Sequence, residues 1–475
     1  MFDIIVIGAG VTGAFISREL SQYDLNVLVI EKENDVGNVT SMANSAIVHS
    51  GYDPVPGTLK AKLNVLGNKM FPNVCKDLEV EFEQIGSLTV AIYDEQIKML
   101  EELAIRSKEN GVDVSLLSKE EVLSIEPNLS NEVKGALLAK SAGIVNPFTL
   151  VLHALENAVD NGVKLVLGET VNSIRKENDI YVVKTNKNEY QSKLIIDAAG
   201  IYADEIHKMI ENIDYEIKPR KGEYYVLDHY KKGLVNHVIF PLPSEKGKGI
   251  LITPTTSGNY LVGPSSEFIS DKDDLSTDKM TLDNVKKQAQ SLVPDIPFNQ
   301  TIRIFSGNRP TPSTHDFIIK FADSDDHFIV VSGIESPGLA SSVAIGQYVV
   351  NEFVRKKIDL TKKDSYNPKT KHRIIPKYLS IDERNNLIKK DPNYGIIVCN
   401  CEKTTLGEIL DELSRSIPPK TIKGVKKRTR AGFGKCQGGF CQPLVIKLLS
   451  DYYHIDMDEV KYDKNDSIIC KFLSK

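Results

Sequence analysis

Short apolar runs and a helical apolar pattern alternate over the start of the chain. Ile4–Ile7 and Val27–Ile30 are apolar, and the apolar residues between them recur at the spacing of a helix. This pattern predicts a strand, a helix and a second strand. Gly8, Gly10 and Gly13 stand between the first strand and the helix in the order G-x-G-x-x-G, so the connection is predicted to be a tight turn.

The three glycines of this turn predict a dinucleotide site. Gly8 makes the turn, Gly10 lets the backbone approach a pyrophosphate, and Gly13 lets the helix lie close to the strand. The free N–H groups of the helix N-terminus face the phosphates. Glu31 follows the second strand, where a carboxylate can bind the ribose hydroxyls. The motif by itself does not choose between FAD and NAD.

The apolar pattern before residue 355 changes at Ile217 and again after Ile302. Helical and buried-strand patterns predominate at first, and between Ile217 and Ile302 alternating segments are broken by Gly and Pro, which predicts an antiparallel sheet. We therefore expect an α/β fold in which a Rossmann-like domain and an antiparallel-sheet substrate domain are interleaved. The nucleotide-binding parts are placed at about 1–75, 145–215 and 303–355, and the substrate-domain parts at about 76–144 and 216–302.

The last 120 residues differ again in pattern. Residues 356–393 are rich in Lys, Asp and Pro and are interpreted as a linker that passes over the surface. Residues 394–450 contain four cysteines and a helical pattern, which predicts a small helical domain, and 451–475 is interpreted as a C-terminal tail.

Composition limits the class of protein. The chain has 475 residues, 41% of them hydrophobic and 26% charged, as in an ordinary soluble globular protein. A net charge of −5 implies no general attraction to nucleic acid or to a membrane. Met1 and Phe2 lead straight into the first strand, which leaves no room for a signal peptide, and no apolar run is long enough to span a bilayer. We expect a cytoplasmic protein.

Four of the six cysteines form a candidate metal site. Cys399 and Cys401 form a C-x-C pair, and Cys436 and Cys441 form a C-x4-C pair. Four thiolates in two close pairs fit either zinc or a [2Fe–2S] cluster. The C-x-C pair is tighter than the usual zinc spacing, and glycines around the second pair let amide N–H groups point at sulfur, so the spacing favours the cluster. The other two cysteines are interpreted as structural.

A basic stretch, Lys420–Arg430, lies between the two cysteine pairs. It contains no interleaved aromatic residues, so a nucleic-acid surface is not indicated. It can compensate the negative charge of a cluster or dock an acidic redox partner. A plain solvated face is equally compatible with the sequence.

Longer segments carry a family resemblance. The segments GAGVTG, NSAIVHSGYDPVPGTLKAKL, IIDAAGIYAD, PRKGEYYVLD and GIESPGLASSVAIG resemble the FAD-dependent oxidoreductases of the D-amino-acid-oxidase superfamily, most closely its glycerol-3-phosphate dehydrogenases and L-2-hydroxyglutarate oxidases. The cysteine region resembles bacterioferritin-associated ferredoxin, a [2Fe–2S] module. A flavin domain followed by this module is the arrangement of the large subunit of anaerobic glycerol-3-phosphate dehydrogenases.

The resemblance implies FAD as the cofactor of residues 1–355 and a [2Fe–2S] cluster on Cys399, Cys401, Cys436 and Cys441, with zinc as the alternative for the cysteine site. Together with the motif, it yields a set of expected FAD contacts from every nucleotide-binding segment. These residues are Gly8, Gly10, Val11, Thr12, Gly13, Glu31, Lys32, Thr40, Ser41, Asn44, Ser45, Ala46, Val171, Ala199, Gly200, Gly307, Gly338 and Leu339.

The resemblance also implies hydride transfer from a secondary alcohol to the flavin. Such a reaction needs a base for the hydroxyl proton and a cation for the anionic end of the substrate. His49 is the candidate base, and Arg309 is the candidate cation because a guanidinium pairs with phosphate or carboxylate. Lys221, Glu223 and Tyr224 are candidate substrate contacts, although only half of a strand can face the site.

The implied reaction is the oxidation of glycerol 3-phosphate to dihydroxyacetone phosphate, with electrons passing through the cluster to a redox partner. Oxidation of L-2-hydroxyglutarate or another 2-hydroxy acid is the first alternative. An electron-relay subunit without substrate turnover is the second. Any association with a membrane is expected to be peripheral and through a partner.

Overall fold

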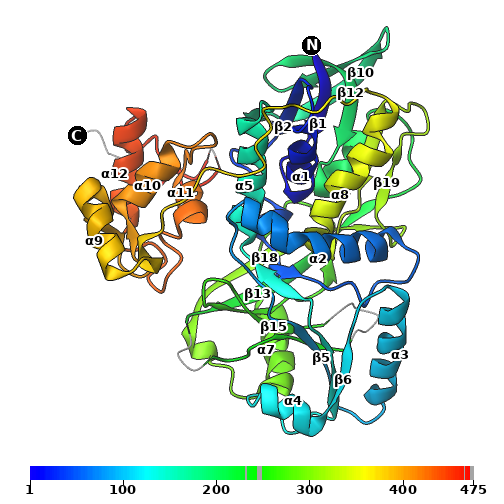
Figure 1. The fold of residues 1–475 in the computed structure, drawn as a ribbon, viewed down its shortest axis with the longest axis vertical. Helices are drawn as coiled ribbons and strands as arrows, with labels where there is room; N and C mark the ends of the chain where they lie inside the picture. The colour runs from blue at the N-terminus through cyan, green and yellow to red at the C-terminus, as the bar shows by residue number, and fades with distance from the viewer. Residues whose placement is uncertain (230–232, 243–248, 465, 471–475) are drawn as a thin grey trace.

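The computed structural model describes residues 1–229, 233–242, 249–464 and 466–470. Figure 1 shows a domain around the N-terminal strand, a second sheet domain below it, and a C-terminal helical domain at their side. The chain crosses between the first two domains several times, so the predicted interleaved α/β architecture is confirmed.

The first sheet is an eight-stranded Rossmann-like sheet. Its order is β10-β11-β12-β1-β2-β9, and β20 pairs with the end of β12 and with β19. β1, β2, β9, β12 and β20 are parallel, and β10, β11 and β19 are antiparallel additions. The strands are β1 (Phe2–Ile7), β2 (Val27–Glu31), β9 (Lys164–Leu167), β10 (Val171–Glu177), β11 (Ile180–Thr185), β12 (Glu189–Asp197), β19 (Ile318–Phe321) and β20 (Phe328–Ser332).

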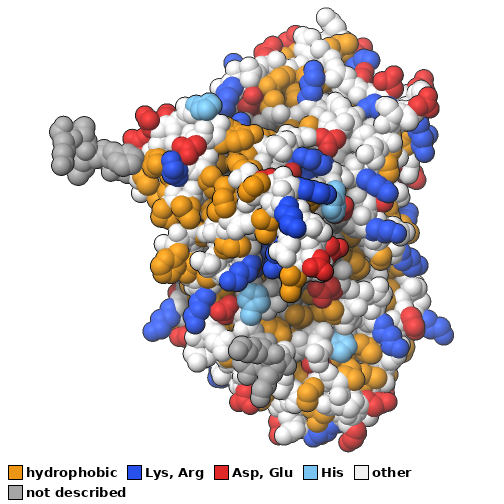
Figure 2. Space-filling model, turned by 60° about the vertical axis from the view of Figure 1, so that its left-hand side comes forward, with side chains coloured by type: hydrophobic (Ala, Val, Ile, Leu, Met, Phe, Trp, Pro, Cys, Tyr) orange, Lys and Arg blue, Asp and Glu red, His pale blue; other side chains and the backbone are white. Residues whose placement is uncertain are grey.

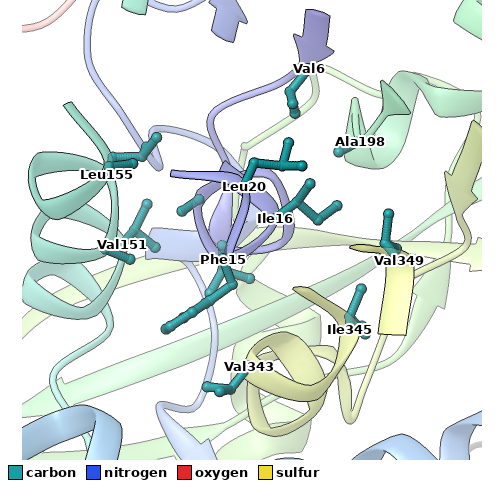
Figure 3. Packing of buried hydrophobic residues seen from close by; sticks show 14 of the residues in the cluster. Val6, Phe15, Ile16, Leu20, Val151, Leu155, Ala198, Val343, Ile345 and Val349 are labelled. Atoms are coloured by element: carbon teal, nitrogen blue, oxygen red, sulfur yellow. The ribbon is translucent and has the colours of Figure 1, made fainter. Parts of the chain in front are cut away.

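On one face of this sheet, α1 (Val11–Leu20) packs between two other helices. The fully buried Ile16 and Leu20 lie between α5 (Pro147–Asp160) and α8 (Gly338–Glu352) in Figure 3. A Cβ on Gly346 of α8 would lie 2.6 Å from the Phe15 carbonyl oxygen, so α8 approaches α1 as only a glycine allows. α2 (Leu59–Asp77) packs beside α8, and α6 (Ala203–His207) follows β12.

The second sheet has nine strands in the order β17-β13-β16-β15-β14-β5-β7-β6, with β18 on the other edge of β13. Its pairs are antiparallel, as predicted, except β14 with β5. The strands are β5 (Ser87–Ala91), β6 (Ser115–Ser118), β7 (Gly135–Ala139), β13 (Ile217–Leu227), β14 (Val238–Pro241), β15 (Leu251–Pro254), β16 (Tyr260–Gly263), β17 (Glu267–Phe268) and β18 (Thr301–Pro312). The predicted boundary at 303 falls inside β18, which belongs wholly to this sheet.

Helices and a small sheet complete the substrate domain. A capping box of Ser118 and Glu121 begins α4. The helices are α3 (Gln96–Glu109), α4 (Lys119–Ile125) and α7 (Lys279–Leu292), and a three-stranded sheet contains β3 (Ile47–Val48), β4 (Phe82–Glu83) and β8 (Gly143–Val145).

The C-terminal domain is helical, as predicted, but it extends beyond the predicted bounds. The expected linker contains the helix α9, which begins with a capping box of Ser380 and Glu383. The expected tail is packed, since Val460 is buried in the core of this domain. The elements are α9 (Ile381–Lys390), α10 (Leu406–Leu413), α11 (Ile422–Thr429), α12 (Gln442–Tyr453) and the hairpin of β21 (Ile397–Cys399) and β22 (Thr404–Thr405).

Buried ion pairs hold the C-terminal domain against the nucleotide-binding domain. Arg428 of α11 donates two hydrogen bonds to the Asp35 carboxylate at 2.9 and 3.0 Å, and Lys427 lies 2.8 Å from the same carboxylate. Arg415 pairs with Glu156 of α5 at 2.9 Å. The basic stretch is therefore not a solvated face: its acidic partner includes Asp35 of the same chain.

Candidate active site and cysteine site

A cavity of about 740 Å³ lies between the two large sheets. The turn after β1, the segment from Thr40 to His49, strands β13 and β18, and the start of α8 all contribute side chains or backbone to its wall. Its volume is that of a small-molecule or cofactor site. The sequence segments that were expected to bind FAD and substrate therefore meet at one place.

The glycine turn has the geometry that the sequence predicts. Gly8 has φ +104°, and a Cβ there would lie 2.5 Å from the Ala198 carbonyl oxygen. A Cβ on Gly13 would lie 2.0 Å from the Gly8 carbonyl oxygen, so helix and strand are in close contact. Gly10, the N-cap of α1, has no side chain to cap the helix; Ser41 Oγ accepts from the Val11 amide, and the other amides of the first turn can bind an anion. These features fit a pyrophosphate.

Glu31 forms hydrogen bonds with the backbone of the same turn. Its buried carboxylate accepts hydrogen bonds from the amides of Ala9 at 2.6 Å and Glu33 at 2.8 Å, and burial raises its pKa. Lys32 lies over the Tyr202 ring, with Nζ 3.6 Å from the ring centroid. The structure thus shows Glu31 ordering the glycine turn, and its contact with ribose stays a prediction.

The predicted FAD contacts divide into two groups. Those that line the cavity are Gly10, Val11, Thr12, Thr40, Ser41, Asn44, Ser45, Ala46, Gly200, Gly307, Gly338 and Leu339. Gly8, Gly13, Glu31, Lys32, Val171 and Ala199 do not line it. Val171 is buried in the core on the other face of the sheet, where it pairs with Thr185 of β11.

Hydrogen bonds within loop 40–46 and to neighbouring segments hold the loop in place. Ser41 Oγ accepts from the Val11 amide at 2.9 Å, and Thr40 Oγ1 donates to the Asn308 carbonyl at 2.8 Å. Asn44 donates to the carbonyls of Thr40 and Ser41. The small residues of this loop therefore form a rigid wall that a flat cofactor can approach.

Two arginines face the cavity from neighbouring strands. Arg220 of β13 pairs in register with Arg309 of β18, and both line the cavity. Arg309 donates to the carbonyls of Arg220, Lys221 and Ser265, and burial lowers its pKa. Within the described ranges no carboxylate forms a salt bridge with Arg309, so its positive charge is available to a substrate anion.

Arg220 was not predicted, and it carries a carboxylate partner. Its Nη2 lies 2.6 Å from Glu335, whose other oxygen lies 2.7 Å from Lys60 Nζ. Glu335 also accepts from Thr311 at 2.8 Å, and its pKa is lowered in spite of burial because Lys60 and Arg220 are close. This arrangement fixes the Arg220 side chain at the cavity wall.

Lys221 and Glu223 are corrections to the predicted substrate contacts. Lys221 Nζ lies 2.9 Å from Asp274, and Glu223 accepts from the Asp278 amide at 2.9 Å; neither side chain lines the cavity. Alternation along β13 sends them to the opposite face from Arg220 and Tyr224. Tyr224 does line the cavity, and its hydroxyl lies 3.1 Å from Ser45 Oγ.

His49 lines the cavity beside Phe240, with the ring centroids 5.7 Å apart. Its backbone carbonyl accepts hydrogen bonds from Asn64 at 2.7 Å and Asn68 at 3.2 Å, both on α2. The backbone of His49 is therefore anchored to two buried asparagines of α2. The position is compatible with the predicted base.

The four cysteine sulfurs form two close pairs in the C-terminal domain, Cys401 with Cys436 and Cys399 with Cys441. Sγ of Cys401 lies 3.7 Å from Sγ of Cys436, a separation close to the roughly 3.8 Å expected for two thiolates about 2.3 Å from one tetrahedral metal. A hydrogen bond from Cys441 lowers the pKa of Cys399 to about 5. The sulfurs thus pair across the two sequence motifs, and the site fits a thiolate-bound metal.

Backbone amides surround these sulfurs, as the glycines suggested. The amides of Gly432 and Glu402 contribute to the lowered pKa of Cys399, and amides of Gly438 and Phe440 lower the pKa of Cys436. Such donors stabilise thiolates and cluster sulfurs.

Comparison with known proteins agrees with this geometry. Residues 3–352 match the family of FAD dependent oxidoreductases, and residues 397–451 match the BFD-like [2Fe-2S] binding domain. The second match favours the iron–sulfur cluster over zinc, so FAD and [2Fe–2S] are the cofactors of this chain.

Similar proteins include a glycerol 3-phosphate dehydrogenase of Caloramator mitchellensis, 47% identical over 99% of this chain and 98% of its own length. A glycerol 3-phosphate oxidase of Mycoplasma pneumoniae is 35% identical over 77% of this chain and 97% of its own. An L-2-hydroxyglutarate dehydrogenase of Arabidopsis thaliana is 28% identical over 74% and 83%.

The solved structures agree as well. The structure of dithionite-reduced L-alpha-glycerophosphate oxidase of Mycoplasma pneumoniae with FAD bound superimposes with a TM-score of 0.75 and 33% identity, covering 79% of this chain and 99% of that one. Among the described residues, none of the helices has both the length and the apolar character needed to cross a bilayer. The chain belongs to the family of FAD-dependent oxidoreductases.

Proposed function

We propose that this protein oxidises glycerol 3-phosphate to dihydroxyacetone phosphate. The observation that carries the proposal is its 47% identity, over nearly the whole of both chains, to a protein named glycerol 3-phosphate dehydrogenase. The relatives named for L-2-hydroxyglutarate match at 30% identity or less and over a smaller part of this chain. The half-buried arginine pair of the cavity supports an anionic substrate.

In this proposal Arg309 binds the phosphate of the substrate. Its guanidinium is held by three carbonyl oxygens and forms no salt bridge with a carboxylate among the described residues, so a phosphate oxygen would be the first anionic atom in direct contact with it. Arg220, whose own charge is shared with Glu335, lies opposite and adds a second positive edge. A phosphate dianion gains more from two guanidinium groups than a carboxylate does.

His49 takes the proton of the reacting hydroxyl. A bound FAD would supply the acceptor for the hydride of the same carbon, and the alcohol, by losing one hydride and one proton, would become a ketone. The anchoring of the His49 backbone to Asn64 and Asn68 holds the imidazole at the wall of the cavity. Phe240 beside the ring keeps part of it away from water.

The docked C-terminal domain supports onward electron transfer through the cluster to a partner acceptor. Gln437 follows Cys436 directly, and its side chain lies 3.5 Å from Arg303 of β18. Arg430 donates to the Asn259 side chain beside β16 at 3.0 Å. The cysteine loop is therefore held next to the substrate domain rather than facing away from it. The cluster, when bound, supplies a one-electron carrier next to a two-electron cofactor.

Anaerobic titration tests the proposed substrate. Purified holoprotein is mixed with glycerol 3-phosphate and, separately, with L-2-hydroxyglutarate, and the flavin absorbance is followed. We expect bleaching by glycerol 3-phosphate only. Bleaching by L-2-hydroxyglutarate alone would identify the alternative substrate class, and bleaching by neither would favour the electron-relay subunit.

A further inference from the structure

A second cavity, of about 480 Å³, lies between the C-terminal domain and the other two domains. Its wall contains parts of β13, β18 and α5 on one side and of α11 and the cysteine loop on the other. It shares Ala43, Asn44 and Ala46 with the cavity of the candidate active site, so it lies on the other side of loop 40–46. Its volume is sufficient for a small organic molecule.

The charges on this wall have one sign. Among the residues that the structure describes, the lining contains no Asp or Glu, and its cationic residues are Arg303, Lys423, Lys426, Lys427 and Arg430. Lys427, Lys423 and Arg430 have partners in Asp35, Asp463 and Glu402, respectively. Arg303 and Lys426 form no salt bridge with any carboxylate that the structure describes. Arg303, which is exposed, and Lys426, which is buried, therefore have no carboxylate partner on this wall.

Lys426 is the more unusual of the two. Lys426 is only 5% exposed, and its ammonium lies 4.7 Å from the centroid of the Phe433 ring. Burial, with the charges of Arg303, Lys423 and Arg430 adding to it, lowers the pKa of Lys426 to about 8, against the opposing charge of Cys441. A cation buried in this way is costly unless an anion joins it.

Aromatic rings form the other part of the wall. Phe148 of α5 packs against Phe433 of the cysteine loop with centroids 5.4 Å apart, and Phe305 of β18 lines the cavity opposite. Hydroxyl groups of Thr256 and Ser257 add polar positions. On the face that Figure 2 presents, Lys and Arg side chains lie among apolar ones. An aromatic body and an anionic group can therefore be bound together.

We propose that this interdomain cavity binds a small aromatic organic anion, a phosphate or a carboxylate, with its charged group between Arg303 and Lys426 and its ring against Phe148, Phe305 and Phe433. The ligand would contact both the oxidoreductase domain and the cluster domain. Its binding is independent of the substrate assigned under the proposed function, since the arginine pair of the active-site cavity takes no part.

Isothermal titration calorimetry on the oxidised full-length holoprotein tests this site. The probes are 1-naphthyl phosphate and 1-naphthoate, which distinguish the two anionic groups, with 1-naphthol and inorganic phosphate as probes that lack the charge or the ring. We expect saturable binding of at least one aromatic anion, and binding about tenfold or more weaker for 1-naphthol and for inorganic phosphate, because each loses part of the contacts.

Three variants locate the binding. Lys426→Met and Arg303→Gln each remove one charge and should weaken binding about tenfold. Arg309→Gln, in the other cavity, should leave it unchanged. Lys426→Met should also raise the melting temperature of the ligand-free protein and abolish its increase on adding the anion. If the Lys426→Met protein lacks the visible spectrum of the cluster, it has lost the cofactor, and the binding measured with Arg303→Gln then decides whether the anion occupies this cavity.

The proposal fails on any of three results. Binding that is lost in Arg309→Gln and kept in Arg303→Gln would assign the ligand to the active-site cavity. Equal binding of 1-naphthol would show that the cations contribute nothing. Absence of saturable binding for both aromatic anions would mean that the cavity is only a gap between domains.

Discussion

Substitution of Asp35 by Asn tests whether buried charge holds the C-terminal domain in place. The Asp35 carboxylate accepts from both terminal nitrogens of Arg428 and lies 2.8 Å from Lys427. All three side chains are less than 10% exposed, so Asp35→Asn would leave two buried cations without a carboxylate. Breaking a buried pair in this way costs about 3–5 kcal/mol, which corresponds to about two to four orders of magnitude in the docking equilibrium.

Two variants serve as controls. Arg428→Met leaves Asp35 paired with Lys427, so it should cost less than Asp35→Asn, which strands two cations. Asp451→Asn removes an exposed pair with Lys447 on α12, at 3.2 Å, and should cost less than about 0.5 kcal/mol.

Urea unfolding followed by the visible circular dichroism of the cluster measures the stability, and trypsin cleavage in 356–393 measures undocking. We expect the stability to decrease from wild type through Asp451→Asn and Arg428→Met to Asp35→Asn, and trypsin cleavage to be fastest in Asp35→Asn. If Asp35→Asn matches Asp451→Asn in both assays, the ion pairs do not hold the domain and the reasoning is refuted.

Acid should act on the same contact. Arg428 and Lys427 hold the pKa of Asp35 well below its usual range in spite of burial. A group whose pKa is depressed on folding stabilises the folded state fully above its unfolded value of about 3.9 and loses that contribution as the pH falls further. Trypsin cannot be used there, so pepsin cleavage should accelerate below about pH 4 in wild type, and Asp35→Asn should lack this pH-dependent step.

The active site yields three further predictions, and the cysteine site yields one. Gly10→Val should abolish FAD retention, because a side chain would enter the phosphate approach, and a full flavin spectrum would contradict this. Arg309→Lys should lower kcat/KM for glycerol 3-phosphate by about tenfold or more while FAD stays bound; unchanged kcat/KM would make Arg309 structural. His49→Asn should slow single-turnover flavin reduction by about 10²–10⁴-fold and change substrate affinity little; reduction at the wild-type rate argues against a base. Cys436→Ser should preserve flavin reduction and impair transfer to the acceptor, and stoichiometric zinc without iron in the wild type would exclude the cluster.

Local sequence was sufficient wherever the signal is local. The G-x-G-x-x-G turn and its two strands were found because each depends on residues a few positions apart. The capping box of Ser380 and Glu383 gives an equally local signal, and it identifies α9 inside the segment that composition alone suggests to be a linker.

Long-range geometry was not available in the same way. Alternation along β13 allows either Arg220 or Lys221 to face the cavity, and only the pairing with β18 decides between them. The burial of Lys427 and Arg428 depends on Asp35, nearly 400 residues away in the chain, so no pattern within the basic stretch could reveal it. The pairing of Cys401 with Cys436 across the two motifs is likewise a property of the fold.

The central claim is that glycerol 3-phosphate reduces a flavin whose electrons reach a docked [2Fe–2S] cluster. Electron paramagnetic resonance of anaerobic holoprotein, frozen after mixing with glycerol 3-phosphate, measures this directly. We expect flavin bleaching followed by the signal of a reduced [2Fe–2S] cluster, at a slower rate in Asp35→Asn. A bleached flavin with the cluster still oxidised at equilibrium, while dithionite reduces the cluster readily, would contradict it.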